Sequence, residues 1–522
     1  MRITVKTGEP GSSAADILAI PVFSPGKEKK GAGPKADRPR LSGALARLDR
    51  SLGGVIDRAL ESGDFRGQAD QRLLLYPDAH AGKASIQRLL LVGVGAAEEF
   101  DIEGARRLGG AAASESRERK IGRLTILAPR ARGLRAEDCA AALAEGAVLG
   151  AYRYDRFKKG GRGAAAKKNA APNTTLLFER AEGLAQLRGR AKEGGLLAES
   201  QNVARDLSNA PGNELPPAGL AREARRVARE TGLTCRVIRG AELERGGFSA
   251  LMAVGQGSAN PPQLIVLEHR GGRKRNKAGP LCIVGKGITF DSGGISLKPS
   301  AGMGDMKHDM SGAAAVVGAL RAAALLDLPA HVVGIIAAAE NMPSGTAYRP
   351  GDIIQSRAGK TIEITNTDAE GRVVLADALD YANEKFSPEA MIDLATLTGA
   401  AMIAFGPWAT GAMGNDDALI QEIQSAGEEA SERMCPMPLL PEHLREMRSP
   451  VADLKNAGGR EAGVSTAGAF LQQFVGDTPW AHLDIAGTGW TNRRTPYHRQ
   501  GATGVGVRML IAWIRARVQQ NA

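Results

Sequence analysis

The sequence is poor in the residues that most often cross-link a protein or bind a metal. It has 522 residues but only 4 cysteines and 7 histidines. The cysteines lie far apart and form no C-x-x-C pair, which argues against a disulfide scaffold or a structural zinc ribbon and predicts a reducing, cytoplasmic environment. The H-E-x-x-H signature of many zinc hydrolases is also missing. Any metal site must therefore be built largely on carboxylates.

Long apolar runs are missing too. No stretch reaches the roughly 18 apolar residues that a membrane helix requires. The first 23 residues lack the basic head and unbroken apolar block of a signal peptide. We therefore expect no membrane partner. A hydrophobic fraction of 43% is typical of a globular chain that buries a full core.

Acidic residues do not balance the basic ones, and the formal net charge is +11. Much of the excess lies in short runs at residues 27–30, 156–168 and 270–277. Solvated loops are the simpler interpretation of these runs. The alternative is an electrostatic contact surface for nucleic acid, although aromatic residues make up only 4% of the chain and no known nucleic-acid-binding motif accompanies the runs.

Short apolar runs alternate with amphipathic stretches along the whole chain, which predicts an α/β fold. We expect two domains: a smaller N-terminal α/β domain at 1–184, containing a basic Gly/Ala-rich segment at 156–172, and a larger C-terminal α/β domain at 185–522. In the second domain the apolar runs are nearly continuous, as in a mostly parallel central sheet covered by helices on both faces. The expected strands are 17–23, 88–94, 124–128, 174–178, 262–268, 280–285, 330–338 and 390–394, and the expected helices 45–60, 105–117, 195–207, 311–326 and 372–381.

Charged residues gather in two Gly-rich segments that follow apolar strands. The first runs from Val284 to Met310 and contains Lys286, Asp291, Lys298 and Asp309. A lysine at the end of a buried strand is unfavourable unless it is paired or deprotonated. The carboxyl ends of such strands are also where α/β sheets place their sites. This segment is therefore a candidate site.

The second segment is Asn-Thr-Asp-Ala-Glu-Gly-Arg at 366–372. Asp368 and Glu370 are one residue apart, so a loop can turn both carboxylates toward one centre. Together with Asp291 and Asp309 they carry four negative charges, which two divalent cations would neutralise. Lys298 and Arg372 would then remain for a developing oxyanion or an anionic ligand, as a two-metal hydrolase requires.

Each acid also has a purely structural interpretation. Asp309 could cap a helix that starts at Ser311, and Asp368 a helix that starts at Arg372. Lys298 could be a solvated loop charge. A dinuclear phosphoesterase would use the same metal logic, so the residues alone leave that reaction open.

The two segments resemble the signature regions of the leucyl aminopeptidase (cytosol aminopeptidase) family of dinuclear metallopeptidases. The similarity covers the second half of the chain, including 202–211, 456–474 and 482–490, and is weak in the first third. The resemblance implies that one metal is bound by Lys286, Asp291, Asp309 and Glu370, and the other by Asp291, Asp368 and Glu370. The ions are expected to be Zn or Mn, with Mg or Co as alternatives.

The resemblance also implies the remaining roles. A water that bridges the metals would attack the peptide, Lys298 would stabilise the oxyanion, and Arg372 would hold a bicarbonate that serves as general base. The substrate is a peptide with a free N-terminus. Its first side chain, leucine or a similar apolar residue, would lie against Met306, Thr396, Leu397 and Gly399. The family forms homohexamers, and some of its members also bind DNA, which keeps a second, DNA-binding role open here.

Overall fold

Contacts divide the chain into two compact units. The structure is a computed structural model that describes residues 1–12, 15–25, 38–77, 86–158, 171–271 and 279–520. Unit 1 consists of Met1–Glu199 and Arg493–Arg499, and unit 2 of Ser200–Asn492 and Gln500–Ala522. The expected domain boundary at 184/185 coincides with the start of helix α6 (Leu184–Asn209), whereas the contact division falls inside that helix.

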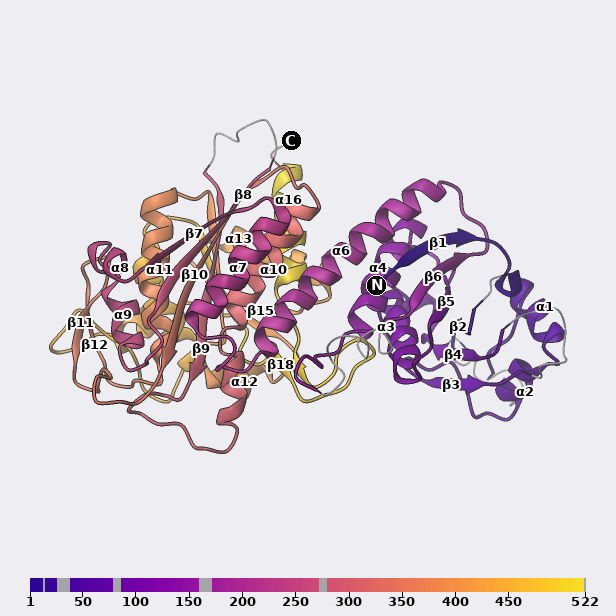
Figure 1. Cartoon of the computed structure of the whole chain (residues 1–522), viewed down its shortest axis with the longest axis horizontal. Coiled ribbons are helices and arrows are strands. Elements are labelled where there is room, and N and C mark those ends of the chain that lie inside the picture. Colours follow the sequence, from indigo (N-terminus) through magenta and orange to yellow (C-terminus); the bar gives the residue numbers. More distant parts are fainter. Residues whose placement is uncertain (13–14, 26–37, 78–85, 159–170, 272–278, 521–522) are drawn as a thin grey trace. The chain divides into compact units, whose positions relative to one another are not determined.

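Unit 1 is a six-stranded sheet with helices packed on it (Figure 1). The strand order is β1 (Ile3–Thr7), β6 (Asn173–Phe178), β5 (Arg123–Leu127), β2 (Ile17–Val22), β4 (Leu89–Gly93) and β3 (Arg72–Leu75), with only β3 antiparallel to its neighbour. Along β2, Ile17 and Ala19 pack with helices α3 (Ile102–Glu118) and α4 (Ala136–Gly150). The alternate residues Leu18 and Ile20 pack with α1 (Gly43–Ser51) and α2 (Val55–Glu61). The sheet is therefore covered on both faces.

The expected helix at 45–60 is wrong as a single element. The chain forms α1 and α2 instead, and the interruption contains Gly53 and Gly54, whose φ angles are 75° and 73°. Glycine adopts this left-handed conformation without the steric penalty of a side chain, and it ends a helix there. The apolar spacing continues through the break because the buried residues of both short helices, Leu48 in α1 and Ile56 and Leu60 in α2, pack into one hydrophobic cluster.

Unit 2 is built on an eight-stranded sheet. The order is β15 (Met434–Pro436), β14 (Thr410–Gly414), β17 (Trp480–Asp484), β13 (Ala390–Ala395), β9 (Leu281–Asp291), β10 (His331–Asn341), β8 (Gln263–Arg270) and β7 (Thr234–Arg239). The four central strands β17, β13, β9 and β10 are parallel. Two short sheets accompany it: β11 (Ile353–Gln355), β12 (Thr361–Glu363) and β16 (Leu454–Lys455), and β18 (Trp490–Thr491) with β19 (Gly501–Ala502).

Helices lie on both faces of this sheet, which confirms the predicted α/β class. One set comprises α7 (Pro217–Thr231), α10 (Ser311–Leu325) and α16 (Val507–Gln520); the other comprises α9 (Ser249–Gly255), α11 (Glu370–Phe386) and α15 (Gly463–Leu471). The remaining helices are α8 (Ala241–Arg245), α12 (Gly399–Phe405), α13 (Asp417–Ala430) and α14 (Pro441–Glu446). Strands β9 and β10 are buried along almost their whole length, which explains their continuous apolar runs.

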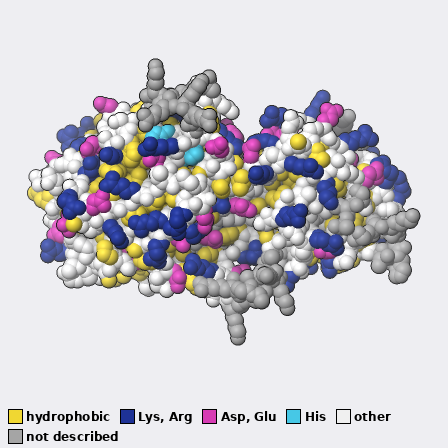
Figure 2. All heavy atoms as spheres, turned by 45° about the horizontal axis from the view of Figure 1, so that its top comes forward, with side chains coloured by type: hydrophobic (Ala, Val, Ile, Leu, Met, Phe, Trp, Pro, Cys, Tyr) yellow, Lys and Arg dark blue, Asp and Glu magenta, His cyan; other side chains and the backbone are white. Residues whose placement is uncertain are grey.

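The basic runs fall mostly where the structure gives no description. Residues 27–30 and 159–168, and most of 270–277, lie outside the described residues. On the face drawn in Figure 2, the described Lys and Arg side chains are scattered among acidic and apolar ones. Among the described helices, none combines enough length with enough apolar character to cross a lipid bilayer.

Candidate metal centre

The candidate residues meet at the carboxyl ends of the central strands of unit 2. Strand β9 carries Lys286 and ends at Asp291, and the neighbouring strand β13 ends one residue before Thr396. Asp309 follows the 3₁₀ helix Met303–His308, and Glu370 is the first residue of α11. The site therefore occupies the edge of the sheet where parallel strands of an α/β fold place their ligands.

Three of the predicted acids form one buried cluster. Carboxylate oxygens of Asp291, Asp309 and Glu370 lie within 4.8 Å of one another, and all three side chains are buried. Burial raises the pKa of both Glu370 and Asp309, and repulsion from the neighbouring carboxylate of Asp291 raises both further. An arrangement of this kind requires cations beside it.

Lys286 reaches into the centre of this cluster. Its Nζ lies 2.8 Å from an oxygen of Asp309 and 2.8 Å from Oε1 of Glu370, and it donates a 2.9 Å hydrogen bond to the carbonyl of Thr396. Burial alone would lower the pKa of Lys286, but the surrounding carboxylates outweigh it and raise the pKa. A Cβ on Gly371 would stand 2.6 Å from Cε of Lys286, so only glycine lets the amine approach the start of α11.

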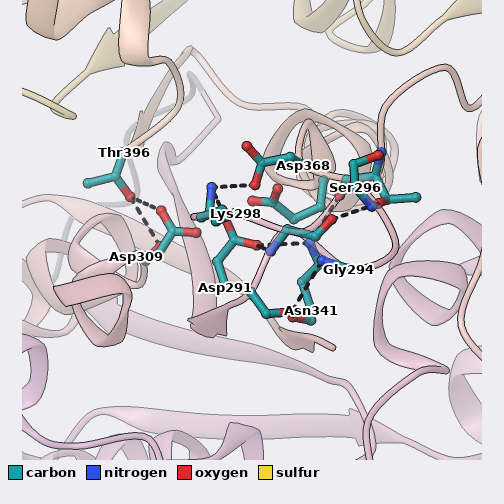
Figure 3. Close-up of polar contacts among 12 residues, drawn as sticks. Asp291, Gly294, Ser296, Lys298, Asp309, Asn341, Asp368 and Thr396 are labelled. Carbon is teal, nitrogen blue, oxygen red and sulfur yellow. Dashed lines mark hydrogen bonds and ion pairs between the residues drawn. The ribbon is translucent and has the colours of Figure 1, made fainter. Parts of the chain in front are cut away.

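Lys298 bridges the other two carboxylates (Figure 3). Its Nζ lies 2.8 Å from Oδ2 of Asp291 and pairs with Oδ1 of Asp368. Burial opposes the charge of Lys298, yet Asp291 and Glu370 raise its pKa, so it is a cation at neutral pH. Burial and the neighbouring Asp291 raise the pKa of Asp368. The solvated-loop interpretation of Lys298 is therefore wrong.

The acids are not helix caps. Helix α10 starts at Ser311 with Met310 in the cap position, and α11 starts at Glu370 with Ala369 there; neither cap makes a side-chain hydrogen bond. Asp309 instead accepts a 2.7 Å hydrogen bond from the hydroxyl of Thr396. The capping interpretation of Asp309 and Asp368 fails because the carboxylates turn toward the lysines.

The donor set fits divalent metal ions. Four buried carboxylate oxygens make no hydrogen bond: Oδ2 of Asp309, Oδ1 of Asp368, and both oxygens of Glu370. Three of them, Oδ2 of Asp309, Oδ1 of Asp368 and Oε1 of Glu370, instead form ion pairs with Lys286 or Lys298. Carboxylates gathered in this way without other partners are what a metal ion would coordinate. Four carboxylates face only two lysine ammonium groups, so negative charge is in excess. Carboxylate oxygens with one amine suit Zn, Mn, Mg or Co.

Several residues that hold the site in shape are absent from the sequence-based set. Asn341, the last residue of β10, donates hydrogen bonds of 2.8 Å to Asp291 and 3.0 Å to the carbonyl of Thr367. The hydroxyl of Tyr348 donates to the same carbonyl at 2.8 Å. The hydroxyl of Thr367 donates to the carbonyl of Gly293 and accepts from the amide of Ser296, which joins the loop after β9 to the loop before α11. Asn341 had one signal in the sequence, its place at the end of an apolar strand.

Of the four expected pocket residues, Thr396 is the one that the structure brings into hydrogen-bond contact with the cluster. Thr396 contacts Asp309 and Lys286 directly. Leu397 is partly buried against the main core of unit 2, and Gly399 starts α12. Met306 lies in the 3₁₀ helix three residues before Asp309. Arg372 lies in the first turn of α11, and its Nε is buried without a hydrogen-bond partner.

An α/β domain whose central parallel strands end in this carboxylate and lysine cluster has the donor set that a metal-dependent hydrolase requires. Residues 202–511 match the catalytic domain of the cytosol aminopeptidase family, and residues 19–160 match its N-terminal domain. The chain belongs to the cytosol aminopeptidase family, and it is a metal-dependent aminopeptidase.

Curated relatives agree over nearly the whole length. A probable cytosol aminopeptidase of Roseiflexus castenholzii is 44% identical over 522 residues, covering 99% of both chains. One of Geotalea uraniireducens is 46% identical and covers 90% of this chain and 92% of its own. Among solved structures, a mutant of tomato leucine aminopeptidase matches with a TM-score of 0.84 at 32% identity, covering 98% of this chain and 96% of its own.

A second structural neighbour was solved with a bound metal. The bottromycin maturation enzyme BotP, solved in complex with Mn, matches with a TM-score of 0.80 at 36% identity and covers 97% of this chain and 100% of its own. Both this match and the tomato enzyme span both units of the chain. The predicted α/β fold and family are therefore confirmed.

Proposed function

We propose that this aminopeptidase uses two divalent metal ions, held by Lys286, Asp291, Asp309, Asp368 and Glu370. The observation that carries the proposal is the buried convergence of Asp291, Asp309 and Glu370 with oxygens within 4.8 Å. Zn or Mn is the expected pair, and Mg or Co the alternative. For Lys286 to bind a metal, its amine must lose the proton that the surrounding carboxylates now stabilise.

The chemistry that such a pair supplies when bound is Lewis acidity toward the scissile carbonyl and activation of water at neutral pH. Lys298 supplies a positive charge beside Asp291 and Asp368, where negative charge develops on the carbonyl oxygen during attack. A fixed cation at this point stabilises the transition state more than the ground state, and it therefore acts on turnover.

Arg372 is proposed to hold a bicarbonate as the general base. Its buried Nε donates no hydrogen bond, and a buried guanidinium N–H without an acceptor is unfavourable. Burial lowers the pKa of Arg372 to about 10, so it stays cationic at neutral pH. A small oxyanion beside it would satisfy both the hydrogen bond and the charge.

The proposed substrates are peptides with a free N-terminus and leucine or a similar apolar residue first. The first side chain would lie against Met306, Thr396, Leu397 and Gly399. A Cβ added to Gly399 would meet no heavy atom within 4 Å, so there is open space beside this residue. We further propose a cytoplasmic homohexamer, in line with the names of the relatives and with the resemblance of the chain to a hexameric family.

Metal analysis combined with an assay tests the proposal. Glu370→Ala should lose bound metal and nearly all hydrolysis of a leucyl anilide, because it removes a carboxylate from the centre of the cluster. Glu384→Ala is the matched control, since Glu384 lies on the same helix with an exposed carboxylate. Full activity in a verified metal-free sample would contradict the proposal, and hydrolysis of a phosphate diester instead would favour the phosphoesterase.

Lys298→Ala separates the two roles within the site. It should keep its metal and still lose turnover by about a hundredfold or more, the usual loss for one transition-state donor. A variant that loses both metal and activity would make Lys298 part of the metal-binding framework.

A further inference from the structure

Unit 1 contains a cluster of arginines that the aminopeptidase reaction does not use. Glu118 is the last residue of α3, and its Oε1 pairs with three guanidinium groups: those of Arg494 and Arg499, which donate hydrogen bonds, and that of Arg153 at 3.8 Å. All four residues belong to unit 1. We call Arg153, Arg494 and Arg499 the arginine cluster.

The charges of this cluster are not balanced. Three arginines share one carboxylate, which leaves two positive charges in excess. The excess positive charge acts on two neighbouring arginines. Burial lowers the pKa of Arg72, and the charges of Arg494 and Arg499 lower it further. Burial also lowers the pKa of Arg117, again with a contribution from Arg499. The acids that raise these two pKa values already have other cationic partners: Glu115 pairs with Arg119, and Asp155 pairs with Lys158.

Two donors of the cluster have no acceptor. Nη1 of Arg153 and Nε of Arg499 are buried and make no hydrogen bond. A buried N–H on a charged group costs more than a neutral one when it is left unbonded. The side chain of Arg494 is 56% exposed, so the cluster stays open to solvent on one side. The unbonded donors therefore lie buried in a cluster whose third guanidinium group, that of Arg494, is open to solvent.

We propose that the arginine cluster binds a phosphate-type oxyanion. A dianion would balance the two excess charges, and its several oxygens would accept from guanidinium groups that approach from different directions. Glu118 holds the guanidinium groups together before the anion arrives, so little ordering is needed on binding. The charge can come from one dianionic phosphate of a small free compound, or from two neighbouring phosphodiester groups of a nucleic-acid backbone, each with one negative charge; both present phosphate oxygens.

Titration of the full-length protein with inorganic phosphate tests the site. Calorimetry is run at constant ionic strength against sodium chloride, on the wild type, Arg153→Gln and Arg499→Gln. We expect saturable binding by the wild type and about tenfold weaker binding by each variant, since each removes a charged donor. Arg119→Gln is the matched control: it removes the arginine that directly follows α3 and pairs with Glu115 outside the cluster.

A second arm uses a labelled duplex DNA of about 20 base pairs in place of phosphate, read by anisotropy at two salt concentrations. Weakening of phosphate binding alone by the two cluster variants identifies a small phosphate compound, and weakening of DNA binding identifies the backbone. Equal behaviour of Arg153→Gln, Arg499→Gln and Arg119→Gln toward both probes overturns the proposal, as does the absence of binding by the wild type. Circular dichroism without ligand checks that each variant is folded. If Arg499→Gln unfolds, the result for Arg153→Gln decides the test, because Arg153 contacts Glu118 at the longer distance of 3.8 Å and contributes less to the fold.

Discussion

At the scale of single residues, Asp484 connects the proposed substrate loop at 396–399 to the central sheet of unit 2. It ends β17, next to β13, and it is 1% exposed. Its Oδ2 accepts a 2.7 Å hydrogen bond from the hydroxyl of Thr398, and its Oδ1 accepts from the amides of Leu397 and Ala486 at 3.2 and 3.1 Å. Because Thr396 is held by Asp309 on the other side, the loop is fixed at both ends.

Asp484→Ala should loosen this loop without disturbing the metal. We expect normal metal content, a kcat/KM for leucyl substrates about tenfold lower, and a smaller preference for leucyl over alanyl substrates, since a hydrogen bond to a charged group contributes about 1.5–3 kcal/mol. Asp484→Asn should restore part of the loss because it keeps an acceptor. An unchanged leucyl-to-alanyl ratio in Asp484→Ala would show that the loop does not select the first residue.

Asp377 carries a pH dependence away from the metal site. It lies on α11, fully buried, and accepts hydrogen bonds from the amides of Leu251 at 2.9 Å and Arg357 at 2.8 Å. Burial raises its pKa to about 7, against the effect of these amides. Between the ordinary pKa near 3.8 and about 7 the folded state therefore binds a proton that the unfolded state releases.

Stability should fall as the pH rises through this window, and the loss should be complete above about pH 7. Asp377→Asn cannot ionise, so its melting temperature should decline less than that of the wild type between pH 5 and 8. Thermal unfolding of both proteins after removal of metal by a chelator measures the difference. Parallel curves would mean that Asp377 is ionised in the fold throughout this range.

Residues whose surroundings are local in sequence were predictable, and those that depend on distant partners were not. Four site residues can be picked out from the sequence because charged residues are unusual in Gly-rich segments at the ends of apolar strands: Lys286, Asp291, Asp368 and Glu370. Asp484 also ends a strand, but its role depends on Thr398, which is 86 residues away in the sequence. Such pairing arises only when β13 and β17 become neighbours in the sheet.

At the scale of elements, the central strands and helices of both units were predictable from apolar runs, while their ends were not. Strand β9 extends beyond the predicted 285 to Asp291, and α11 starts at Glu370, not at Arg372. In both cases the extra residues include charged ones of the candidate site, Lys286 and Asp291 in β9 and Glu370 in α11, which apolar periodicity excludes. Strand β9 therefore carries two residues of the proposed metal site, Lys286 and Asp291, directly on backbone that the sheet holds in place.

Helices α3 and α4 pack through glycines, which sets a second test. A Cβ on Gly146 would stand 1.8 Å from the carbonyl oxygen of Arg106, so the helices would have to separate. Gly146→Ala should destabilise unit 1 by about 1–3 kcal/mol, as overpacking usually does. The matched control is Gly189→Ala, at an exposed position of helix α6 where an added Cβ meets no atom within 4 Å; it should stabilise by about 0.5–1 kcal/mol.

Chemical denaturation of the two variants measures both effects. Opposite signs are expected because the same substitution improves helix propensity in each and clashes in only one. Stabilisation by Gly146→Ala would mean that the helices have room to shift apart.

At the scale of the whole molecule, apolar side chains remain exposed on unit 2. Ile403 on α12 is 87% exposed, and Trp408, just after the helix, is 60% exposed. Large apolar residues gathered in one short segment mark an association surface more often than a solvated one. This segment follows the proposed substrate loop directly, so an assembly that covers it would also shape access to the site.

Six chains of 54.6 kDa would have a mass of about 330 kDa, and light scattering after gel filtration should find this species if the proposed hexamer forms. Ile403→Glu should shift the mass toward smaller assemblies, because a carboxylate buried between subunits is unfavourable without a partner. Val451→Glu is the control, since Val451 is an exposed apolar residue of unit 2 outside this segment. A wild type that elutes as a monomer would contradict the hexamer, whereas a hexamer that Ile403→Glu leaves intact would place the interface on another surface.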